Sequence, residues 1–438
     1  MLNRGEFARA EKPHNASEET ITMLFGSSGI RRRYDLPLLE LGLSLGSALA
    51  ATVSEVVAGM DTRTSSPILA DVAIAGLLSG GAHVSFGGVA PTPTIAFGAR
   101  NHDAGLMITA SHNPEDYNGL KVFNPDGSSF TPLQQEALEQ KMGASQWKGW
   151  ECQGEMEEAD LLSGHRNTIL DQREVSRDLI AVIDCGNGAG SVITPDLLSA
   201  MGIGTIPLNC HTGGHFARPS EPLEEGLGYV AEMVRARSAD CGVVHDGDAD
   251  RMMGFDARGR FIDGDRLMVL FARYLDAGKI VTTMDASMII EDVAEVQRTP
   301  VGDTYVSTRL REWGDFGGEP SGAWIFPGHS LCPDGIYAAA LFCEMASEWD
   351  IAEDLDRIPR YPIVRESRPC SDAEGVLLRL GAVSPTDGIR KEEEDGWFLI
   401  RASGTEPKVR ITAEGKTGQA VKRIAEKARE MLKRAESA

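Results

Sequence analysis

Three aspartates spaced two residues apart are the strongest chemical signal in this sequence. Asp246, Asp248 and Asp250 lie in the segment HDGDADR, directly after the apolar run CGVV. In an extended backbone, this spacing turns all three carboxylates to one face. Three adjacent carboxylates repel one another unless a cation lies between them. Because hard oxygen ligands favour Mg²⁺ over softer metals, the segment predicts a magnesium site.

Two other interpretations of the aspartate segment need to be weighed. An EF-hand loop also begins D-x-D-x-D, but it requires Gly at the sixth position and Glu at the twelfth. Counted from Asp246, those positions hold Arg251 and Ala257, which excludes an EF-hand. A solvated acidic turn is the alternative that needs no metal.

A serine after another apolar segment is the candidate nucleophile. Ser111 lies in TASHNP, which follows GLMI and is rich in residues that favour exposed turns. Ser111 could accept a phosphoryl group, with His112 or Asn113 orienting it. A simple turn capped by Asn113 explains the same residues, so this segment alone does not separate the two interpretations.

The segment RASGTEP has the composition of a phosphate-binding turn. Arg401 offers a forked guanidinium to an anion, and Ser403 and Thr405 offer hydroxyls. Gly404 leaves the backbone amides free to form an anion-binding nest. Arg410 follows on the next strand-like segment. A surface turn is the alternative.

The segment GGEPSG is a weaker candidate for binding a sugar. Its glycines would let the backbone approach a ligand closely. Glu319 and Ser321 could hydrogen-bond adjacent sugar hydroxyls. A plain turn explains the isolated segment equally well.

Three segments that share one plan are expected to position these residues. Each has an apolar strand, an Asp, a turn of small residues, a helix and a second strand, and the aspartates are Asp61, Asp184 and Asp285. Alternation on this scale predicts βαβ units with largely parallel sheets. Its recurrence predicts three similar α/β domains in tandem.

The end of the chain differs from these repeats and predicts a smaller α+β domain. It closes with a helix predicted over about residues 417–435, with one apolar stripe. The proline-containing segment RIPRYPIVRESRP predicts a linker before it. We expect a tail over residues 1–22 that is disordered or not native, followed by four domains. Their expected ranges are 23–150 with the serine, 151–253 with the aspartates, 254–362 with GGEPSG and 363–438 with RASGTEP.

Composition limits the partners of this 438-residue chain. Its net charge of 43 − 65 = −22 argues against a nucleic-acid partner, which requires a basic footprint. A few local arginines can still hold a small phosphate. No apolar run is long enough to span a bilayer, and seven scattered cysteines form no CxxC pair. We expect a cytoplasmic protein without a membrane partner, and the sequence leaves a homo-oligomer open.

In this order, the segments resemble the alpha-D-phosphohexomutase superfamily. The resemblance covers nearly the whole chain from Met23, through LFGSSGIR, PTPTIAF, TASHNP, NGLKVF, DGDADR, GGEPSG, PDGIY and RASGTEP. It implies four domains around a central cleft, three alike and the last smaller. The GGEPSG form is similar to archaeal-type members. The chain departs from several relatives by reading GSSGIRRR near its start, and it has Ala323 where many bacterial relatives have His.

The resemblance also implies roles for individual residues. Ser111 matches a phosphoserine whose phosphate completes the magnesium coordination, and Lys121 matches a lysine that is a candidate general base. The predicted metal ligands are Ser111, Asp246, Asp248 and Asp250. The predicted catalytic residues are Ser111, His112, Lys121 and Arg251. The predicted substrate-binding residues are Glu319, Ser321, Arg401, Ser403, Gly404, Thr405 and Arg410.

The implied reaction interconverts hexose 6-phosphate and hexose 1-phosphate. The implied cofactors are Mg²⁺, phosphate carried on Ser111, and a hexose 1,6-bisphosphate as intermediate and activator. We expect glucosamine phosphate as the substrate, with mannose and glucose phosphates as alternatives. A sugar phosphatase with an aspartyl nucleophile is the rival of another class, although it needs Thr or Val where this chain has Asp250. A sugar-phosphate binding protein without activity is the third hypothesis.

Overall fold

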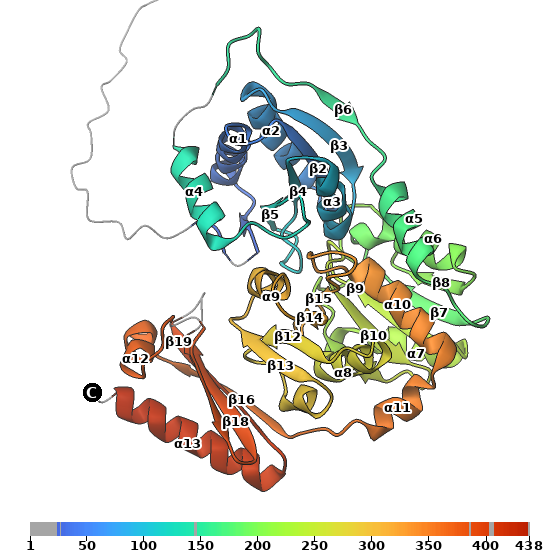
Figure 1. Ribbon diagram of the computed structural model, residues 1–438, viewed down its shortest axis with the longest axis vertical. Coiled ribbons are helices and arrows are strands. Elements are labelled where there is room, and N and C mark those ends of the chain that lie inside the picture. The colour runs from blue at the N-terminus through green and yellow to red at the C-terminus, as the bar shows by residue number, and fades with distance from the viewer. Residues whose placement is uncertain (1–23, 27, 144–146, 385–386, 403–406, 437–438) are drawn as a thin grey trace, which may run out of the picture.

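The computed structural model describes residues 24–436, apart from residues 27, 144–146, 385–386 and 403–406. The expected tail over residues 1–22 therefore lies outside the described residues, as do Ser403, Gly404 and Thr405. The described chain forms four units, each built on one sheet (Figure 1). Within the described ranges, no helix is long and apolar enough to cross a membrane.

The first unit has a six-stranded sheet in the order β1-β5-β4-β2-β3-β6. β2 is parallel to β3 and β4, whereas β5 is antiparallel to β4. The strands are β1 (Ile30–Arg33), β2 (Glu55–Met60), β3 (His83–Val89), β4 (Ala104–Ile108), β5 (Tyr117–Phe123) and β6 (Met156–Glu158). The helices are α1 (Leu36–Ala50), α2 (Ser66–Ser79), α3 (Thr92–Gly98), η1 (Ala99–Asn101) and α4 (Pro132–Met142).

The second unit has a five-stranded sheet in the order β11-β10-β9-β7-β8. β7 is parallel to β8 and β9, and β10 is antiparallel to β9. The strands are β7 (Ile180–Asp184), β8 (Gly204–Leu208), β9 (Cys241–His245), β10 (Met252–Asp256) and β11 (Phe261–Ile262). The helices are α5 (Leu162–Gln172), η2 (Ala189–Val192), α6 (Thr194–Ala200), η3 (Glu224–Gly226) and α7 (Gly228–Ala236).

The third unit has a four-stranded sheet in the order β13-β12-β14-β15. Its apolar side chains join those of the second unit in one buried cluster, so these two units share a core. The strands are β12 (Lys279–Thr283), β13 (Glu295–Thr299), β14 (Phe316–Gly318) and β15 (Trp324–Ile325). The helices are α8 (Gly264–Tyr274), η4 (Met288–Asp292), α9 (Asp303–Leu310), α10 (Gly335–Glu348) and α11 (Ile351–Arg357).

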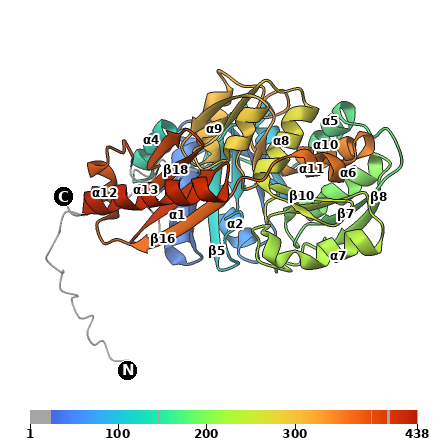
Figure 2. The ribbon, with the colours of Figure 1, turned by 90° about the horizontal axis from the view of Figure 1, so that it is seen from below.

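The fourth unit is an antiparallel sheet in the order β16-β19-β18-β17 with its own core. The strands are β16 (Ile363–Pro369), β17 (Ile389–Glu393), β18 (Gly396–Ala402) and β19 (Lys408–Gly415). The helices are α12 (Ala373–Arg379) and α13 (Gly418–Glu436). α13 confirms the predicted terminal helix and lies along the sheet (Figure 2). Its predicted apolar stripe is buried and consists of Val421, Ile424, Ala425, Ala428 and Leu432.

The first three units repeat one topology, which confirms the predicted tandem α/β fold. In each, a first strand pairs in parallel with a second and a third, and the third pairs antiparallel with a fourth. The three sets are β2, β3, β4 and β5; β7, β8, β9 and β10; and β12, β13, β14 and β15. Asp61, Asp184 and Asp285 all lie at or just after the first strand of a set.

The sheets cross two of the expected domain boundaries. β6 pairs with β3 of the first sheet although it lies beyond residue 150. β10 pairs with β9 and runs past residue 253. We therefore propose domain divisions after β6 and after β11 in place of residues 150 and 253, because strands of one sheet fold as one unit.

Candidate active site

The predicted site residues of the first three units, apart from Lys121 on β5, lie on the same connection of the repeated topology. Ser111 lies between β4 and β5, Asp246 between β9 and β10, and Glu319 between β14 and β15. Loops at the carboxyl ends of parallel strands are where α/β proteins commonly bind ligands. The Ser111 hydroxyl donates to Asp246 Oδ2 at 2.9 Å, which brings the first two loops together.

The third loop joins the second through the backbone. Arg251 forms an antiparallel bridge with Ala323, and the Met252 amide donates to the Gly322 carbonyl oxygen at 3.0 Å. The segment GGEPSG is thereby fixed beside the aspartate loop. The structure thus brings together the serine, the aspartates and the predicted sugar-binding segment, which lie far apart in the sequence.

The Ser111 loop is held by an arginine that the sequence reasoning missed. Ser111 has a φ of 50°, and its side chain is buried. Arg63 is buried as well, and its Nη2 donates to the carbonyl oxygens of Ser111 at 2.7 Å and Asn113 at 2.8 Å. Asp61 Oδ2 accepts from Arg63 Nε at 2.9 Å.

Arg63 has a counterpart in the second repeat. Asp184, the counterpart of Asp61 in the second unit, also binds an arginine, Arg218, at 3.0 Å. The sequence marked both aspartates but gave no indication that each anchors a guanidinium against the next functional loop.

The three aspartates gather as predicted, although the local backbone is a turn rather than an extended strand. Residues 246–250 follow the end of β9, and Ala249 has a φ of 54°. Asp246, Asp248 and Asp250 each offer a carboxylate oxygen within 4.8 Å of the others, and all three are buried. Asp248 Oδ1 and Asp250 Oδ1 have no hydrogen-bond partner. Unpaired buried carboxylate oxygens are the donor set that Mg²⁺ prefers, so these residues fit a magnesium ion.

Burial and mutual repulsion shape the charge of this cluster. Burial raises the pKa of Asp246, and the charges of Asp250 and Asp248 raise it further. Burial also opposes ionisation of Asp248, but the Lys121 ammonium outweighs it and holds the pKa of Asp248 below its ordinary value. Lys121 Nζ lies 2.7 Å from Asp248 Oδ2 and 2.6 Å from Asp250 Oδ2.

Lys121 is consequently a cation in this arrangement. Burial disfavours its ammonium form, but Asp248 and Asp250 together raise the pKa of Lys121 above its ordinary value. An ammonium donates protons and cannot accept one. Thr92, from the segment PTPTIAF, completes this group, because its hydroxyl donates to Asp248 Oδ2 at 2.5 Å. Sequence reasoning assigned no role to Thr92.

Cationic and neutral side chains surround the serine on its other sides. His112 Nδ1 lies 3.4 Å from Ser111 Oγ. Burial, with the charges of Arg251 and Arg31, lowers the pKa of His112 to about 2, so its ring is neutral. Arg31 Nε is buried without a hydrogen-bond partner. Arg251 Nη1 lies 3.3 Å from Glu221 Oε1. Arg251 and Arg31 thus lie close enough to His112, the residue after the serine, for their charges to act on its ring.

The two predicted sugar-binding residues contact each other. The Ser321 hydroxyl donates to Glu319 Oε2 at 3.2 Å, and the Gly302 amide donates to Glu319 Oε1 at 2.7 Å. Burial raises the pKa of Glu319 to about 7, and the charge of Asp303 adds to the effect.

Arg401 and Arg410 lie apart from this group. They are paired with each other across β18 and β19 in the fourth unit. Within the described part of the chain, neither makes a hydrogen bond or ion pair with the residues around Ser111. The remaining residues predicted for this loop, Ser403, Gly404 and Thr405, lie outside the described residues.

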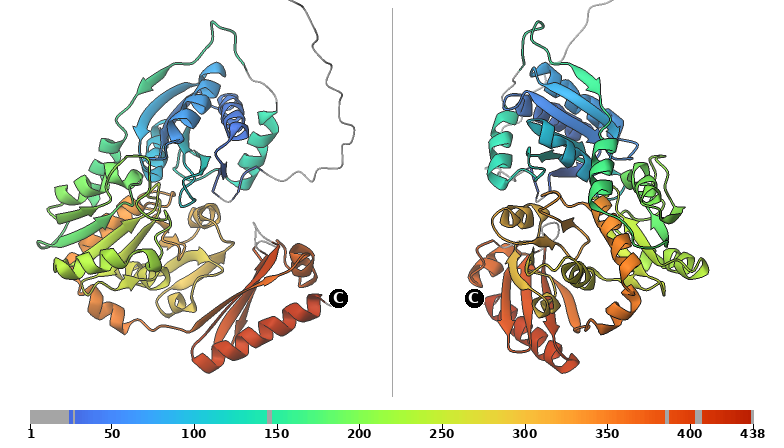
Figure 3. Two further views of the ribbon diagram at one scale, coloured as in Figure 1. Left: turned by 180° about the vertical axis from the view of Figure 1, so that it is seen from behind. Right: turned by 45° about the vertical axis from the view of Figure 1, so that its right-hand side comes forward.

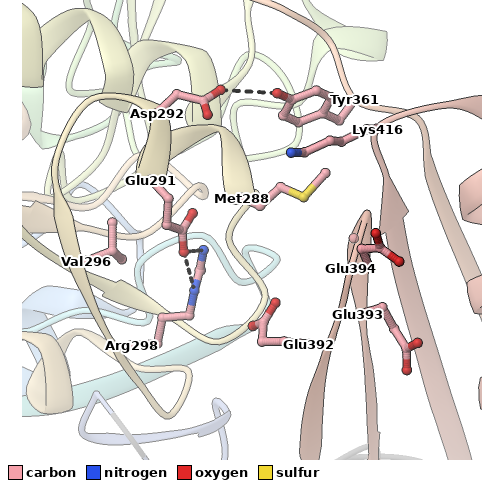
Figure 4. Close-up of a pocket in the computed structure, with 11 residues that line it drawn as sticks. Met288, Glu291, Asp292, Val296, Arg298, Tyr361, Glu392, Glu393, Glu394 and Lys416 are labelled. Carbon is pink, nitrogen blue, oxygen red and sulfur yellow. Dashed lines mark hydrogen bonds and ion pairs between the residues drawn. The ribbon is translucent and has the colours of Figure 1, made fainter.

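A cavity separates the third and fourth units without including any predicted site residue (Figure 4). Its volume is about 560 Å³. On the side of the third unit, Glu291 pairs with Arg298, and Asp292 accepts from Tyr361 at 3.1 Å. Glu392, Glu393 and Glu394 line the opposite side. The joint between the two units is therefore incompletely packed.

Four family models match the chain in order. They describe the phosphoglucomutase/phosphomannomutase alpha/beta/alpha domain I at residues 22–148, domain II at 163–259, domain III at 263–361 and the C-terminal domain at 364–431. Together they cover most of the sequence, including every predicted site residue.

Curated relatives and a solved structure match over nearly the whole chain. A probable phosphoglucosamine mutase of Methanocella arvoryzae is 42% identical over 94% of this chain and 98% of its own length. A protein of the same name from Methanosarcina barkeri is 42% identical over 90% of this chain and 95% of its own length. A phosphoglucomutase/phosphomannomutase family protein from Burkholderia thailandensis has a TM-score of 0.82 at 26% identity, covering 94% of this chain and 97% of its own.

Proposed function

This chain belongs to the phosphoglucomutase/phosphomannomutase family, and we propose that within it the enzyme acts as a phosphoglucosamine mutase. The observation that carries the reaction class is the contact between Ser111 Oγ and Asp246 inside a buried triad of aspartates. The names of the relatives that are 42% identical over nearly the full length support glucosamine phosphate.

Charge near Glu319 supports an amino sugar as the substrate. Asp303 and Asp285 lie close enough to Glu319 for their charges to raise its pKa, while the charge of Arg251 lowers it. A sugar ammonium beside these carboxylates would relieve their repulsion, whereas the hydroxyl of glucose or mannose would not. The amino group of glucosamine phosphate thus fits this part of the site better than a neutral substituent.

In the proposed reaction, Ser111 begins each cycle phosphorylated. Its phosphorus–oxygen bond breaks as a new bond forms to the free hydroxyl of the bound sugar phosphate, giving a hexose 1,6-bisphosphate. The intermediate then turns end for end, and Ser111 takes back the other phosphate. Arg251 and Arg31 would balance the charge on the transferring oxygens.

Magnesium bound at Asp246, Asp248 and Asp250 would neutralise charge on the phosphoryl oxygens. Lys121 is the proposed base for the sugar hydroxyl. For that role, Lys121 has to separate from Asp248 and Asp250, because their carboxylates raise its pKa and keep it protonated.

The phosphate that is not being transferred needs a binding site of its own. We assign it to Arg401 and Arg410, with Ser403, Gly404 and Thr405 between them in sequence. Glu319 and Ser321 would bind the sugar hydroxyls. Hydrogen bonds from two arginines suit a phosphate dianion, because a guanidinium can bind it in a bidentate manner.

The proposed partners are small molecules, and the proposed location is the cytoplasm. All seven cysteines are free, as expected in a reducing compartment. An acidic protein with a net charge of −22 offers no basic footprint for nucleic acid.

Comparison of kcat/KM for glucosamine 6-phosphate, mannose 6-phosphate and glucose 6-phosphate tests the substrate. We expect glucosamine 6-phosphate to be preferred by at least about tenfold, which corresponds to roughly 1.4 kcal/mol of transition-state binding. Asp303→Asn should reduce that preference more than it reduces turnover of glucose 6-phosphate. Equal or greater kcat/KM for either neutral sugar would refute the assignment to glucosamine phosphate.

A further inference from the structure

We propose that His165, His329 and Asp334 form a second metal site, which binds one divalent cation of the zinc class. His165 lies on α5, whereas His329 and Asp334 lie between β15 and α10. All three side chains are buried, and their ligand atoms gather within 4.8 Å of one another. None of them belongs to the proposed catalytic machinery, so the inference does not depend on the substrate.

The spacing of the donor atoms fits zinc coordination. His165 Nε2 lies 2.9 Å from Asp334 Oδ2, His329 Nε2 lies 3.3 Å from the same oxygen, and the two ring nitrogens are 3.5 Å apart. Zinc binds nitrogen and oxygen at about 2.0–2.2 Å in tetrahedral geometry, which places neighbouring donor atoms about 3.3 Å apart. The three atoms therefore form a triangle of the size expected for one face of that tetrahedron.

The remaining atoms of the three side chains are arranged as outer contacts of a metal site. His165 Nδ1 lies 3.0 Å from Thr94 Oγ1, and His329 Nδ1 lies 3.0 Å from Gln172 Oε1. If each ring carries its proton on Nδ1 and donates to these oxygens, both Nε2 lone pairs face Asp334. Ligating histidines commonly donate their second N–H to an oxygen in this manner.

The carboxylate and the rings are also held in place. Asp334 Oδ1 accepts from the Ile336 amide at 3.0 Å and the Tyr337 amide at 2.9 Å, which leaves Oδ2 for the metal. The Tyr337 ring stacks on the His329 ring with centroids 4.2 Å apart.

The site would fix the connection between three units of the fold. Thr94 belongs to α3 of the first unit, His165 to α5, and Asp334 begins α10 of the third unit. Gly335 follows immediately and packs against the loop of the catalytic aspartates, because a Cβ there would lie 2.7 Å from the Ala249 carbonyl oxygen. A metal at Asp334 would therefore support the position of that loop without touching substrate.

Titration of the full-length, metal-stripped protein with Co²⁺ tests the proposal. Four-coordinate cobalt with nitrogen ligands absorbs visible light far more strongly than octahedral cobalt with oxygen ligands, so the two candidate sites give different spectra. We expect one equivalent of strongly absorbing Co²⁺, displaced by Zn²⁺, in the wild type and in Asp248→Asn. His329→Gln should lose this absorption, and His211→Gln, at an exposed histidine, should keep it.

Two results would overturn the second metal site. One is a wild type that is folded by circular dichroism but gives no strong absorption with Co²⁺ and retains no zinc after growth with added Zn²⁺. The other is an unchanged cobalt spectrum in His329→Gln. If His329→Gln does not fold, the wild type and Asp248→Asn still decide the matter, because the proposal requires one strongly absorbing equivalent in both.

Discussion

Ser111, Lys121 and the three aspartates form a network in which the carboxylates, gathered within 4.8 Å of one another, link the Ser111 contact to the Lys121 contacts. The serine hydroxyl donates to Asp246, and Lys121 joins Asp248 to Asp250. Without Lys121 or a metal, three buried carboxylates would repel one another. The network therefore makes the site sensitive to removal of any one charge.

Asp248→Asn should lower magnesium-dependent activity by at least about a hundredfold, because it removes one hard ligand together with an ion pair to Lys121. Initial rates over a range of Mg²⁺ concentrations measure the effect. Asp171→Asn, on the exposed side of α5, is the matched control and should behave as wild type. A loss of less than tenfold at saturating Mg²⁺ would remove Asp248 from the metal site.

The pKa of Glu319, raised to about 7 by burial and by Asp303, predicts a pH dependence. Below that pH, Glu319 is protonated and accepts hydrogen bonds from the sugar poorly, whereas above it the carboxylate is ionised. We expect kcat/KM to fall by up to about tenfold per pH unit below 7. Glu319→Gln should lower kcat/KM at pH 8 and flatten that limb. An unchanged acid limb in Glu319→Gln would contradict the assignment.

Residue types and spacing were sufficient to single out the three aspartates, because their chemistry is local, whereas Ser111 was assigned its role by the family resemblance. The partners of these residues could not be predicted from spacing. Lys121 contacts Asp248 across 127 positions of sequence, and Arg63 contacts Ser111 across 48. Such contacts depend on which strand ends lie side by side in the fold, and the composition of a segment does not indicate this.

At the scale of elements, the repeated sheet places three functional loops on equivalent connections. The Ser111 and Asp246 loops approach each other closely at Gly247. A Cβ at Gly247 would lie 2.8 Å from the Ser111 carbonyl oxygen and 2.7 Å from Ser220 Oγ. The absence of a side chain at this position is therefore a condition for the contact between the two loops.

Gly247→Ala should reduce kcat by roughly ten- to a hundredfold, because a small displacement of positioned groups is costly in catalysis. Its melting temperature should fall by only a few degrees, since overpacking typically costs about 1–3 kcal/mol. Gly228→Ala is the control, because nothing lies within 4 Å of a Cβ at that position. Wild-type kcat in Gly247→Ala would show that the loops tolerate separation.

The sequence predicted the repeated plan of strand and helix, but one predicted helix is of another type. The third repeat has a 3-10 helix, η4 (Met288–Asp292), where the plan predicts a helix. β12 ends at Thr283 and β13 begins at Glu295, so the connection has room for little more than a short helical turn. The order of strand, Asp and turn could be predicted from the sequence. The form of the helix in the third repeat depends on how few residues separate β12 from β13.

At the scale of the whole molecule, the fourth unit stands apart from the first, and α9 lies between them in Figure 1. Figure 3 shows the two units from two further sides. It is tied to the third unit through Glu414, which accepts from the Ser287 hydroxyl and from the Met288 amide at 2.8 Å. The cavity beside this contact leaves room for rotation at the joint. No local sequence pattern could predict this relative placement.

If Arg401 and Arg410 bind the second phosphate, the fourth unit has to move toward Ser111 when the sugar binds. Small-angle X-ray scattering should then show a smaller radius of gyration with Mg²⁺ and glucose 1,6-bisphosphate than with Mg²⁺ alone. Closure of this kind also keeps water from a reactive phosphoryl group. Arg401→Ala should weaken the change, and an unaltered radius in the wild type would contradict closure.

Transfer of labelled phosphate tests the central claim, that Ser111 carries the phosphoryl group. The protein is incubated with Mg²⁺ and glucose 1,6-bisphosphate labelled on its phosphates, and the labelled peptide is identified by mass spectrometry. We predict label on Ser111 in the wild type, loss of that label when glucosamine 6-phosphate is added, and none in Ser111→Ala. Label on Asp246 or Asp248, or turnover by Ser111→Ala at the wild-type rate, would contradict the phosphoserine mechanism.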